Sequence, residues 1–577
     1  MASDNIPNLY AYHGRHLLAQ YQARYQTQYR AQYRAHPQSD FRGDIFDYSP
    51  SDMKNAFQLR PPSPEFPVCI IGAGMAGLYT AMIFESLGIP YQIVDTNTRE
   101  RIGGRIFTYR FPGGGTYDYF DVGAMRFPDT PFMKRTFDLV RNRGLSVKLI
   151  PYIRNMVEPS PNTFLFYNNA RVNNGAPSAT DNPFNVDHVD DPSLRTPEGV
   201  SQRVAEVLRP FRGLFRVDPW DPPLDIAKAM EDLSKWVDRL SMRSCMSNIL
   251  GMSAREISWC ETLDKATGSY NQALAETVIG SLVFNWPGKP PKDPNADWYC
   301  FDLMDLTGAN IASGQRSAIR ELQYEPAVKV GIKFSCPWWE TELPQRIHGG
   351  QSYTDLPLRT IVYPSYPHGV TPDKMSKVLI VSYSWVQDAE RLGALINNDG
   401  TAQPELIELV FRDLAAVHGV TVEWLQNFYK TGDYFAWDWL RNPLTMGGYA
   451  HFGPGSYDVY SDMVLPAANG KLFFAGEATS DCRGWVTGAL NSAWRAVDQY
   501  LNLSKLEEAR KKFHESWGAS EHWDEVPPKK GKTPFGVGPK DGASYLELVE
   551  LDRKLADRQL VIGLYESGIR PPPRESI

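Results

Sequence analysis

Apolar positions near residue 70 follow two different periods in close succession. Residues 68–71 form a short apolar run that ends in a glycine-rich turn, a pattern typical of a buried parallel strand. Residues 78–87 then carry apolar side chains at helical spacing, and residues 91–95 have the composition of a second strand. The segment therefore predicts a strand, a turn, a helix and a second strand within about 30 residues.

The rest of the chain changes period twice more. Residues 190–300 are mostly helical in pattern, residues 328–390 contain runs with strand character, and residues 471–503 predict a strand and a long helix. We expect an α/β fold in which a dinucleotide-binding domain is joined to a mixed-sheet domain and a helical insertion. The expected parts are an N-terminal arm (1–60), a cofactor domain (61–130 and 465–505), a substrate domain (131–190 and 325–464), a helical domain (191–324) and a charged tail (506–577).

An aromatic stripe marks the N-terminal arm. It consists of Leu17 and four tyrosines that recur every four residues, and it ends before Pro37. This spacing predicts a helix that docks one face on the body of the protein or on a second subunit. The tyrosines are Tyr21, Tyr25, Tyr29 and Tyr33.

Composition narrows the class of protein. The 577 residues are 42% hydrophobic and 22% charged, and the net charge of −7 offers no basic surface for nucleic acid. No apolar run approaches the ~18 residues of a membrane span, and the N-terminus lacks the apolar segment of a secretory signal. We expect a cytoplasmic protein, or an extracellular one if a leader has been removed. The six cysteines form no C-x-x-C pair, so neither a metal site nor a disulfide framework is expected.

A phosphate-binding turn follows the first predicted strand. Residues 72–77 have the spacing G-x-G-x-x-G. Gly72 permits the tight turn, Gly74 lets the backbone approach a pyrophosphate, and Gly77 lets the helix pack on the strand. Asp95 ends the second predicted strand, where an acid can bind ribose hydroxyls. Together these features predict a Rossmann-type dinucleotide site.

A second glycine pair favours FAD over NAD, which the first turn alone does not distinguish. Gly103 and Gly104 follow the acidic strand end and are flanked by arginines. Their backbone N–H groups and the guanidinium of Arg105 can meet further pyrophosphate oxygens.

With these elements in place, the sequence resembles the flavin-containing amine oxidases, and within them the L-amino-acid oxidases. The resemblance covers roughly residues 65–505, and its motifs occur in the family's order. The motifs are residues 103–105 (GGR), 123–128 (GAMRFP), 348–357 (HGGQSYTDLP), 363–365 (YPS), 474–479 (FAGEAT), 484–485 (GW) and 488–489 (GA).

The resemblance implies FAD as the cofactor, an amino acid as the small-molecule substrate, dioxygen as the electron acceptor and a homodimer. Glu477 would bind the ribityl chain. The full set of cofactor-binding residues implied is Gly72, Gly74, Met75, Ala76, Gly77, Asp95, Gly103, Gly104, Arg105, Gly123, Ala124, Met125, Arg126, Gly476, Glu477, Trp485 and Val486.

The resemblance also implies roles around the substrate. Arg126 would grip the substrate carboxylate, Tyr363 would donate a second hydrogen bond to it, and Lys333 would lie near the flavin N5 and hold a water molecule. Each residue also has a purely structural interpretation. Arg126 could form a structural ion pair, Tyr363 could belong to the core, and Lys333 could be a solvated lysine on the polar face of a strand. The residues expected to wall the substrate are Trp439, Gly484 and Trp485.

The expected reaction is oxidative deamination of an L-amino acid to a 2-oxo acid, ammonia and hydrogen peroxide. The same residues would also serve a flavin amino-acid monooxygenase or a tailoring amine oxidase. A basic substrate would suit Asp302 and Asp305, although both acids can equally lie on the surface.

One departure from the family supports a non-enzymatic alternative. Relatives usually carry an insertion between the helical part and the lysine strand, whereas here residues 305–310 run almost directly into residues 315–322. No second FAD-binding strand is visible in that segment. A shortened, inactive FAD-binding scaffold is therefore the alternative to an enzyme.

Overall fold

The computed structural model of the chain describes residues between 67 and 518, with internal gaps. The tyrosine-striped arm, the tail beyond 518, and Asp302 and Asp305 lie outside the described residues, so the predictions made for them stay predictions. The described residues are 67–97, 102–129, 133–143, 150, 152, 163–174, 180–187, 189–213, 240–266, 268–284, 322–366, 371, 374–442, 444–454, 463–464, 466–467, 471–480 and 482–518.

The predicted strand–turn–helix–strand unit is present. β1 (Val68–Ile71) and β2 (Tyr91–Val94) pair in parallel, and α2 (Met75–Leu87) connects them. A Cβ atom on Gly77 would lie 1.9 Å from the carbonyl oxygen of Gly72. Because no side chain fits in that space, the close packing of helix on turn requires glycine at position 77.

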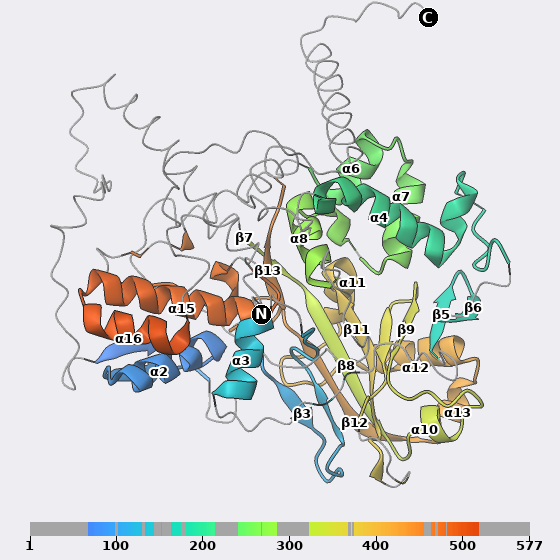
Figure 1. Ribbon diagram of the computed structural model, residues 1–577. Coiled ribbons are helices and arrows are strands. Elements are labelled where there is room, and N and C mark those ends of the chain that lie inside the picture. The colour runs from blue at the N-terminus through green and yellow to red at the C-terminus, as the bar shows by residue number, and fades with distance from the viewer. Residues whose placement is uncertain are drawn as a thin grey trace, which may run out of the picture.

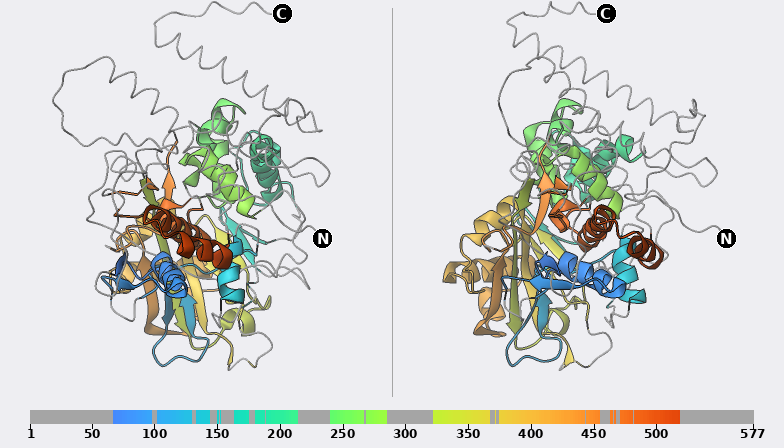
Figure 2. Two further views of the ribbon diagram at one scale, coloured as in Figure 1. Left: turned by 60° about the vertical axis from the view of Figure 1, so that its left-hand side comes forward. Right: turned by 90° about the vertical axis from the view of Figure 1, so that its left-hand side faces the viewer.

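Two helices from the C-terminal end of the described chain complete this part of the molecule. α15 (Val486–Leu503) packs on α2, and α16 (Glu507–Trp517) packs beside both, as Figures 1 and 2 show. The indole ring of Trp517 meets the ring of Tyr79 edge to face, with 5.3 Å between centroids. The C-terminal helices therefore belong to the dinucleotide-binding part, although more than 400 residues separate α16 from α2.

The sheet of this part has two strands among the described residues. The strand predicted at the start of residues 471–503 is absent from the described chain. Leu472 forms only an isolated bridge with Ala467, and the carbonyl oxygen of Phe474 accepts a hydrogen bond from Arg495 Nη2 at 2.8 Å. Ile71 and Val94 are 57% and 48% exposed. A parallel sheet covered on both faces would bury such residues, so one face of β1 and β2 is open.

A seven-stranded mixed sheet forms the centre of the molecule (Figure 1). On one face, Val328, Val330 and Ile332 share a buried apolar cluster with α12 (Pro404–His418). On the other face, Gly331 leaves room for the ring of Phe120, which would lie 2.3 Å from an added Cβ. All neighbours pair antiparallel except β5 with β9. In spatial order the strands are β12 (Tyr429–Asp438), β8 (Ala327–Phe334), β11 (Val378–Trp385), β10 (Thr360–Val362), β9 (Gln351–Thr354), β5 (Phe164–Tyr167) and β6 (Ala170–Asn173).

The predicted helical insertion lies above this sheet in Figure 1. Two of its helices begin at capping boxes, in which the side chains of Ser253 and Glu256, and likewise of Ser241 and Ser244, satisfy each other's backbone N–H groups. Its described helices are α4 (Pro197–Gly213), α6 (Met242–Asn248), α7 (Ala254–Leu263) and α8 (Leu274–Phe284).

Shorter elements connect these parts. β7 (Leu322–Glu325) and β13 (Tyr449–Phe452) form an antiparallel pair outside the large sheet. Other elements of the described chain are β3 (Thr108–Arg110), β4 (Tyr119–Asp121), α3 (Lys134–Asn142), α10 (Trp338–Thr341), α11 (Val386–Gly393) and α13 (Val422–Gln426). Within the described ranges, no helix is both long and apolar enough to cross a membrane, and no group of three or more His, Cys, Asp or Glu side chains could hold a metal ion.

Candidate active site

The two glycine elements predicted to bind phosphate lie against each other. Gly72 and Gly103 have φ angles of +102° and +112°, and Gly104 has +64°, values that favour glycine. The N–H of Gly103 donates to the carbonyl oxygen of Ala73 at 3.0 Å, and Gly103 forms a parallel bridge with Gly74. The structure thus brings the second glycine pair to the first turn, as a shared pyrophosphate site requires.

The N-terminus of α2 faces this turn. Its N-cap is Gly74, so no side chain caps the helix, and its first turn, which includes Met75 and Ala76, carries no acidic residue. The N–H groups and the positive end of the helix dipole are therefore available to a phosphate. These residues fit the diphosphate of a dinucleotide cofactor.

Asp95 fixes the same turn. Its Oδ2 accepts a hydrogen bond from the N–H of Ala73 at 2.5 Å, and its Oδ1 accepts one from the N–H of Asn97 at 2.6 Å. Burial acts to raise the pKa of Asp95, but these hydrogen bonds outweigh it and lower the pKa below its ordinary value. Asp95 is thus an ionised group held beside the turn, and its contact with ribose stays a prediction.

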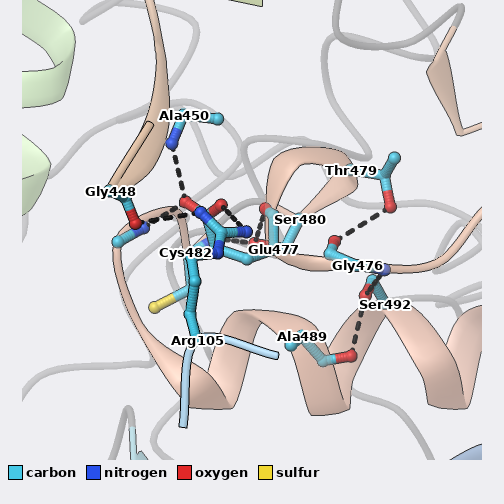
Figure 3. Close-up of polar contacts among 11 residues, drawn as sticks. Arg105, Gly448, Ala450, Gly476, Glu477, Thr479, Ser480, Cys482, Ala489 and Ser492 are labelled. Carbon is cyan, nitrogen blue, oxygen red and sulfur yellow. Dashed lines mark hydrogen bonds and ion pairs between the residues drawn. The ribbon is translucent and has the colours of Figure 1, made fainter. Parts of the chain in front are cut away.

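A buried ion pair joins three segments of the chain, around residues 105, 448–450 and 477–484 (Figure 3). The Nη2 of Arg105 lies 3.3 Å from Glu477 Oε2, and both side chains are 5% exposed. Arg105 also donates to the carbonyl oxygen of Gly448 at 2.9 Å, while Glu477 Oε1 accepts from the N–H groups of Ala450 and Gly484 at 3.0 and 2.5 Å. Glu477 therefore ties the predicted cofactor segments to one another. Its predicted bond to a ribityl chain remains untested.

Two side chains fix the backbone just before the predicted substrate arginine. Lys329 Nζ donates to the carbonyl oxygens of Asp121 and Gly123 at 2.9 and 2.5 Å. Trp439 Nε1 donates to the carbonyl oxygen between them, on Val122, at 3.2 Å. Trp439 is 3% exposed, and its indole N–H is used in this bond. Its N–H therefore fixes the backbone of residues 121–123 and is not available to a substrate.

Lys333 does not join these residues. Its Nζ pairs with Asp433 Oδ2 at 3.5 Å and lies 5.8 Å from the ring centroid of Phe111. Lys329 and Lys333 are four residues apart in β8 and share a face, because strand side chains alternate. Only Lys329 lies at the end of the strand that meets Gly123, so the lysine role predicted for Lys333 suits Lys329 better.

Arg126 lies among polar and aromatic side chains. Its Nη1 donates to Gln351 Oε1 at 3.4 Å. Gln351 also accepts from the hydroxyl of Tyr353 at 2.5 Å and donates to the hydroxyl of Tyr152 at 2.6 Å. Burial acts to lower the pKa of Arg126, but the surrounding phenols, including that of Tyr383, raise the pKa above its ordinary value. The amide of Gln351 thus connects the Arg126 guanidinium with the phenols of Tyr152 and Tyr353.

Tyr383 connects Arg126 with the lysine and with the cofactor motifs. Lys329 Nζ lies 4.8 Å from the centroid of the Tyr383 ring. Tyr383 also influences the pKa of Tyr449. Burial raises that pKa well above its ordinary value, and the nearby Glu325 and Tyr383 raise it further. The ring of Tyr449 in turn packs beside Gly484, so that a Cβ atom added to this glycine would lie 3.6 Å from the ring.

Tyr363 lies elsewhere, so its predicted contact with the substrate carboxylate has no support in the structure. It is 1% exposed and belongs to the apolar cluster beneath α12, on the other face of the sheet from Tyr383 and Lys329. Its hydroxyl is 2.7 Å from His418 Nε2 and 2.9 Å from Ser352 Oγ. The motif at 363–365 therefore contributes a core tyrosine.

The remaining predicted residues surround the same region. Gly484 has a φ of +75°, and Trp485 is half-buried at the N-cap of α15, which begins at the buried Val486. Gly476, with a φ of +123°, donates its N–H to Ser492 Oγ at 2.8 Å. The segment after β4 carries Gly123, Ala124 and Met125, of which Met125 is 7% exposed and packs in the apolar cluster that includes Trp439.

Sequence reasoning missed Lys329, Tyr383 and Tyr152. The alternation along residues 327–334 places Lys329 and Lys333 on one face, but it does not say which end of that face meets residue 123. Strict alternation along residues 378–385 would place Tyr383 with Leu379 and Val381 on the face covered by α12. The register irregularity between Ile380 and Ser382 turns it to the other face instead, and the sequence carries no signal for that irregularity.

Comparison with known proteins agrees with this geometry. The family model for flavin-containing amine oxidoreductases matches residues 307–501, and that for the NAD(P)-binding Rossmann-like domain matches residues 70–142. The chain is 36% identical to L-amino-acid oxidase 4 of Hebeloma cylindrosporum over 573 aligned positions, which cover 82% of this chain and 87% of that protein.

Two further comparisons differ in what they support. A putative bifunctional amine oxidase of Dictyostelium discoideum is 31% identical, covering 78% of this chain but 47% of that protein, so the chain spans about half of its length. The solved structure of cyclohexylamine oxidase from Brevibacterium oxydans superposes with a TM-score of 0.51 at 15% identity, covering 77% of this chain and 99% of that one. At this identity the superposition shows the fold alone.

Proposed function

Because the chain belongs to the flavin-containing amine oxidoreductase family, whose cofactor is FAD, we propose that it oxidises an L-amino acid to a 2-oxo acid. The observation that carries the proposal is the position of Arg126. Its guanidinium lies beside Gln351 and Tyr383, next to a segment whose carbonyls are held by Lys329. A guanidinium fork suits a planar carboxylate, and a simple amine substrate would have no partner for it.

The residues divide between cofactor and substrate. The turns at 72–77 and 103–105 would hold the diphosphate of FAD, and the segment at 476–486 would hold its other end. The chemistry that FAD supplies when bound is two-electron oxidation at the substrate Cα and the later reduction of dioxygen. Arg126 and Tyr383 would bind the carboxylate and so orient the Cα–H bond, and such orientation can contribute on the order of 7 kcal/mol.

We assign the lysine role of the family to Lys329 rather than to Lys333. The two carbonyl oxygens of Asp121 and Gly123 fix its ammonium at 2.9 and 2.5 Å. From that position an ammonium group can orient a water molecule near the reacting carbon. The overall reaction consumes the amino acid, dioxygen and water, and it yields the 2-oxo acid, ammonia and hydrogen peroxide.

The test compares Arg126→Met with Arg110→Met, which removes an exposed arginine of β3. Loss of the carboxylate contact should raise KM for an L-amino acid by roughly 100-fold in the first variant, since a charged hydrogen-bonded pair supplies about 2 to 5 kcal/mol. The second variant should keep the wild-type KM. Equal turnover by both variants would show that the carboxylate is not recognised there, and would favour an oxidase of unusual amines.

Product analysis separates the remaining alternative that uses the same residues. Ammonia and peroxide formed in equal amounts identify the oxidase. An amide with one carbon fewer, together with carbon dioxide, would identify the monooxygenase instead.

A further inference from the structure

A second cation lies close to the Arg126 cluster, and it comes from the helical part of the molecule. Lys265 follows α7, and its Nζ lies 3.8 Å from the centroid of the Tyr353 ring. The hydroxyl of that tyrosine donates to Gln351 Oε1 at 2.5 Å, the same oxygen that accepts from Arg126 Nη1 at 3.4 Å. The ammonium and the guanidinium therefore lie at the two ends of one short chain of contacts.

The backbone at Lys265 is of a kind that side chains normally avoid. The N–H of Lys265 donates to the carbonyl oxygen of Thr262, and the N–H of Ala266 donates to that of Glu261, which together form the Schellman motif that ends α7. Lys265 has the left-handed φ of +64°, at the position of this motif that glycine usually occupies. A lysine held at such a position points to a use for its side chain.

The charge of Lys265 acts on its sequence neighbour Asp264 and helps to lower the pKa of that acid, which burial raises, but the two groups form no ion pair. Among the described residues, no carboxylate oxygen lies within 4.0 Å of its Nζ. Its sequence neighbour Asp264 accepts a hydrogen bond from the hydroxyl of Tyr270 at 3.1 Å instead. The ammonium rests on an aromatic face, a contact weaker than an ion pair with a partly desolvated carboxylate.

We propose that Lys265 binds the side-chain carboxylate of the substrate, so that the preferred substrates are dicarboxylic L-amino acids of the glutamate class. The inference rests on the proposed function, since it takes Arg126 as the site of the α-carboxylate. With the α-carboxylate on Arg126, the side-chain carboxylate of the same substrate extends toward Tyr353. There the ammonium of Lys265 leaves the aromatic ring and forms an ion pair with that carboxylate. Two cations at the ends of the cluster thus match two carboxylates of one molecule.

L-glutamate and L-glutamine provide a matched pair of probes for the purified holoenzyme, because they differ only in the charge of the side-chain terminus. The wild-type protein should show a kcat/KM at least about tenfold higher for L-glutamate, the effect of roughly one charge-assisted contact. In Lys265→Met this ratio should fall toward one, mainly through the KM for L-glutamate. Lys265→Arg, which keeps the charge, should retain most of the preference.

Charge reversal supplies a gain-of-function variant that a misfolded protein cannot imitate. Lys265→Glu should lower the rate with L-glutamate and raise the rate with L-ornithine relative to wild type. L-leucine is the reference substrate: if the wild-type holoenzyme oxidises no amino acid, the proposed function fails. If it oxidises L-leucine but does not prefer L-glutamate to L-glutamine, or if Lys265→Met leaves that preference intact, the proposed function stands and the role of Lys265 is overturned. A wild-type preference for L-ornithine would also overturn it and point to Asp264.

Discussion

Two lysines on one face of β8 are chemically alike but have different surroundings. Lys329 is 3% exposed and holds two backbone carbonyls beside Arg126, whereas Lys333 is paired with an acid near the end of the strand. We expect Lys329→Met to lower kcat by roughly 100-fold, the lower end of what a positioned proton-handling group contributes. Lys333→Met should stay near the wild-type rate. Steady-state kinetics corrected for flavin content measure both, and a larger loss in Lys333→Met would return the role to that residue.

Two tyrosines differ in the same way. Tyr363→Phe should leave KM unchanged and destabilise the protein by about 1 to 3 kcal/mol, because it removes a buried hydroxyl that contacts His418 and Ser352. Tyr383→Phe should raise KM for the amino acid with little change in the melting temperature. Thermal unfolding and initial rates on the two variants decide the matter, and the opposite pattern would place the carboxylate contact at Tyr363.

At the residue scale, the sequence predicts residues whose role depends on local backbone geometry, such as the glycines of a turn. It does not predict side chains whose position depends on how the strands pair. The glycines at 72–77 and 103–104 could be assigned because a tight turn needs a particular residue at a particular spacing. Tyr363 could not be separated from Tyr383, because strict alternation along their strands would place both on the face covered by α12. Only the register irregularity between Ile380 and Ser382 moves Tyr383 to the other face.

At the element scale, α12 closes one face of the large sheet over a buried histidine. Burial, aided by the charge of Arg171, lowers the pKa of His418 to about 4. In the unfolded chain, His418 takes up a proton near pH 6.5, the ordinary value for histidine, whereas in the folded protein it does so only near pH 4. Stability is therefore complete above about pH 6.5 and falls as the pH drops toward 4, by at most on the order of 3 kcal/mol.

The matched comparison is with His418→Gln, which cannot take up this proton. Chemical denaturation from pH 7 to pH 4 should show a steeper loss of stability in the wild-type protein than in the variant. Every other titrating group is common to the two proteins, so parallel curves would mean that His418 does not resist protonation.

Elements themselves could be predicted where a period is sustained. The alternation at 328–334 and the helical spacing at 78–87 both correspond to observed elements, because their buried faces follow that period. Residues 472–475 have an apolar composition that suggests a strand, but Leu472 forms only an isolated bridge with Ala467, and the carbonyl of Phe474 bonds to the side chain of Arg495. An apolar composition does not show whether a segment has a neighbouring strand to pair with.

At the scale of the whole molecule, the pair of Arg105 and Glu477 joins segments from both ends of the described chain. Glu477→Gln keeps the shape of the side chain but leaves Arg105 buried without a counter-charge. We expect a loss of about 3 to 5 kcal/mol in stability, because an unpaired buried charge is costly, together with a lower ratio of flavin to protein. Thermal unfolding and the visible absorbance of the purified variant measure both. A variant as stable and as yellow as wild type would show that the pair is not what holds the cofactor segments together.

The most direct test is an absorbance spectrum of the purified protein under anaerobic conditions, recorded before and after addition of L-amino acids and of the corresponding amines that lack the carboxylate. The arrangement around Arg126 predicts a flavin band that an L-amino acid bleaches and that the carboxyl-free amine leaves unchanged. A band bleached equally well by the amine, or a protein that carries no flavin at all, would contradict an amino-acid oxidase.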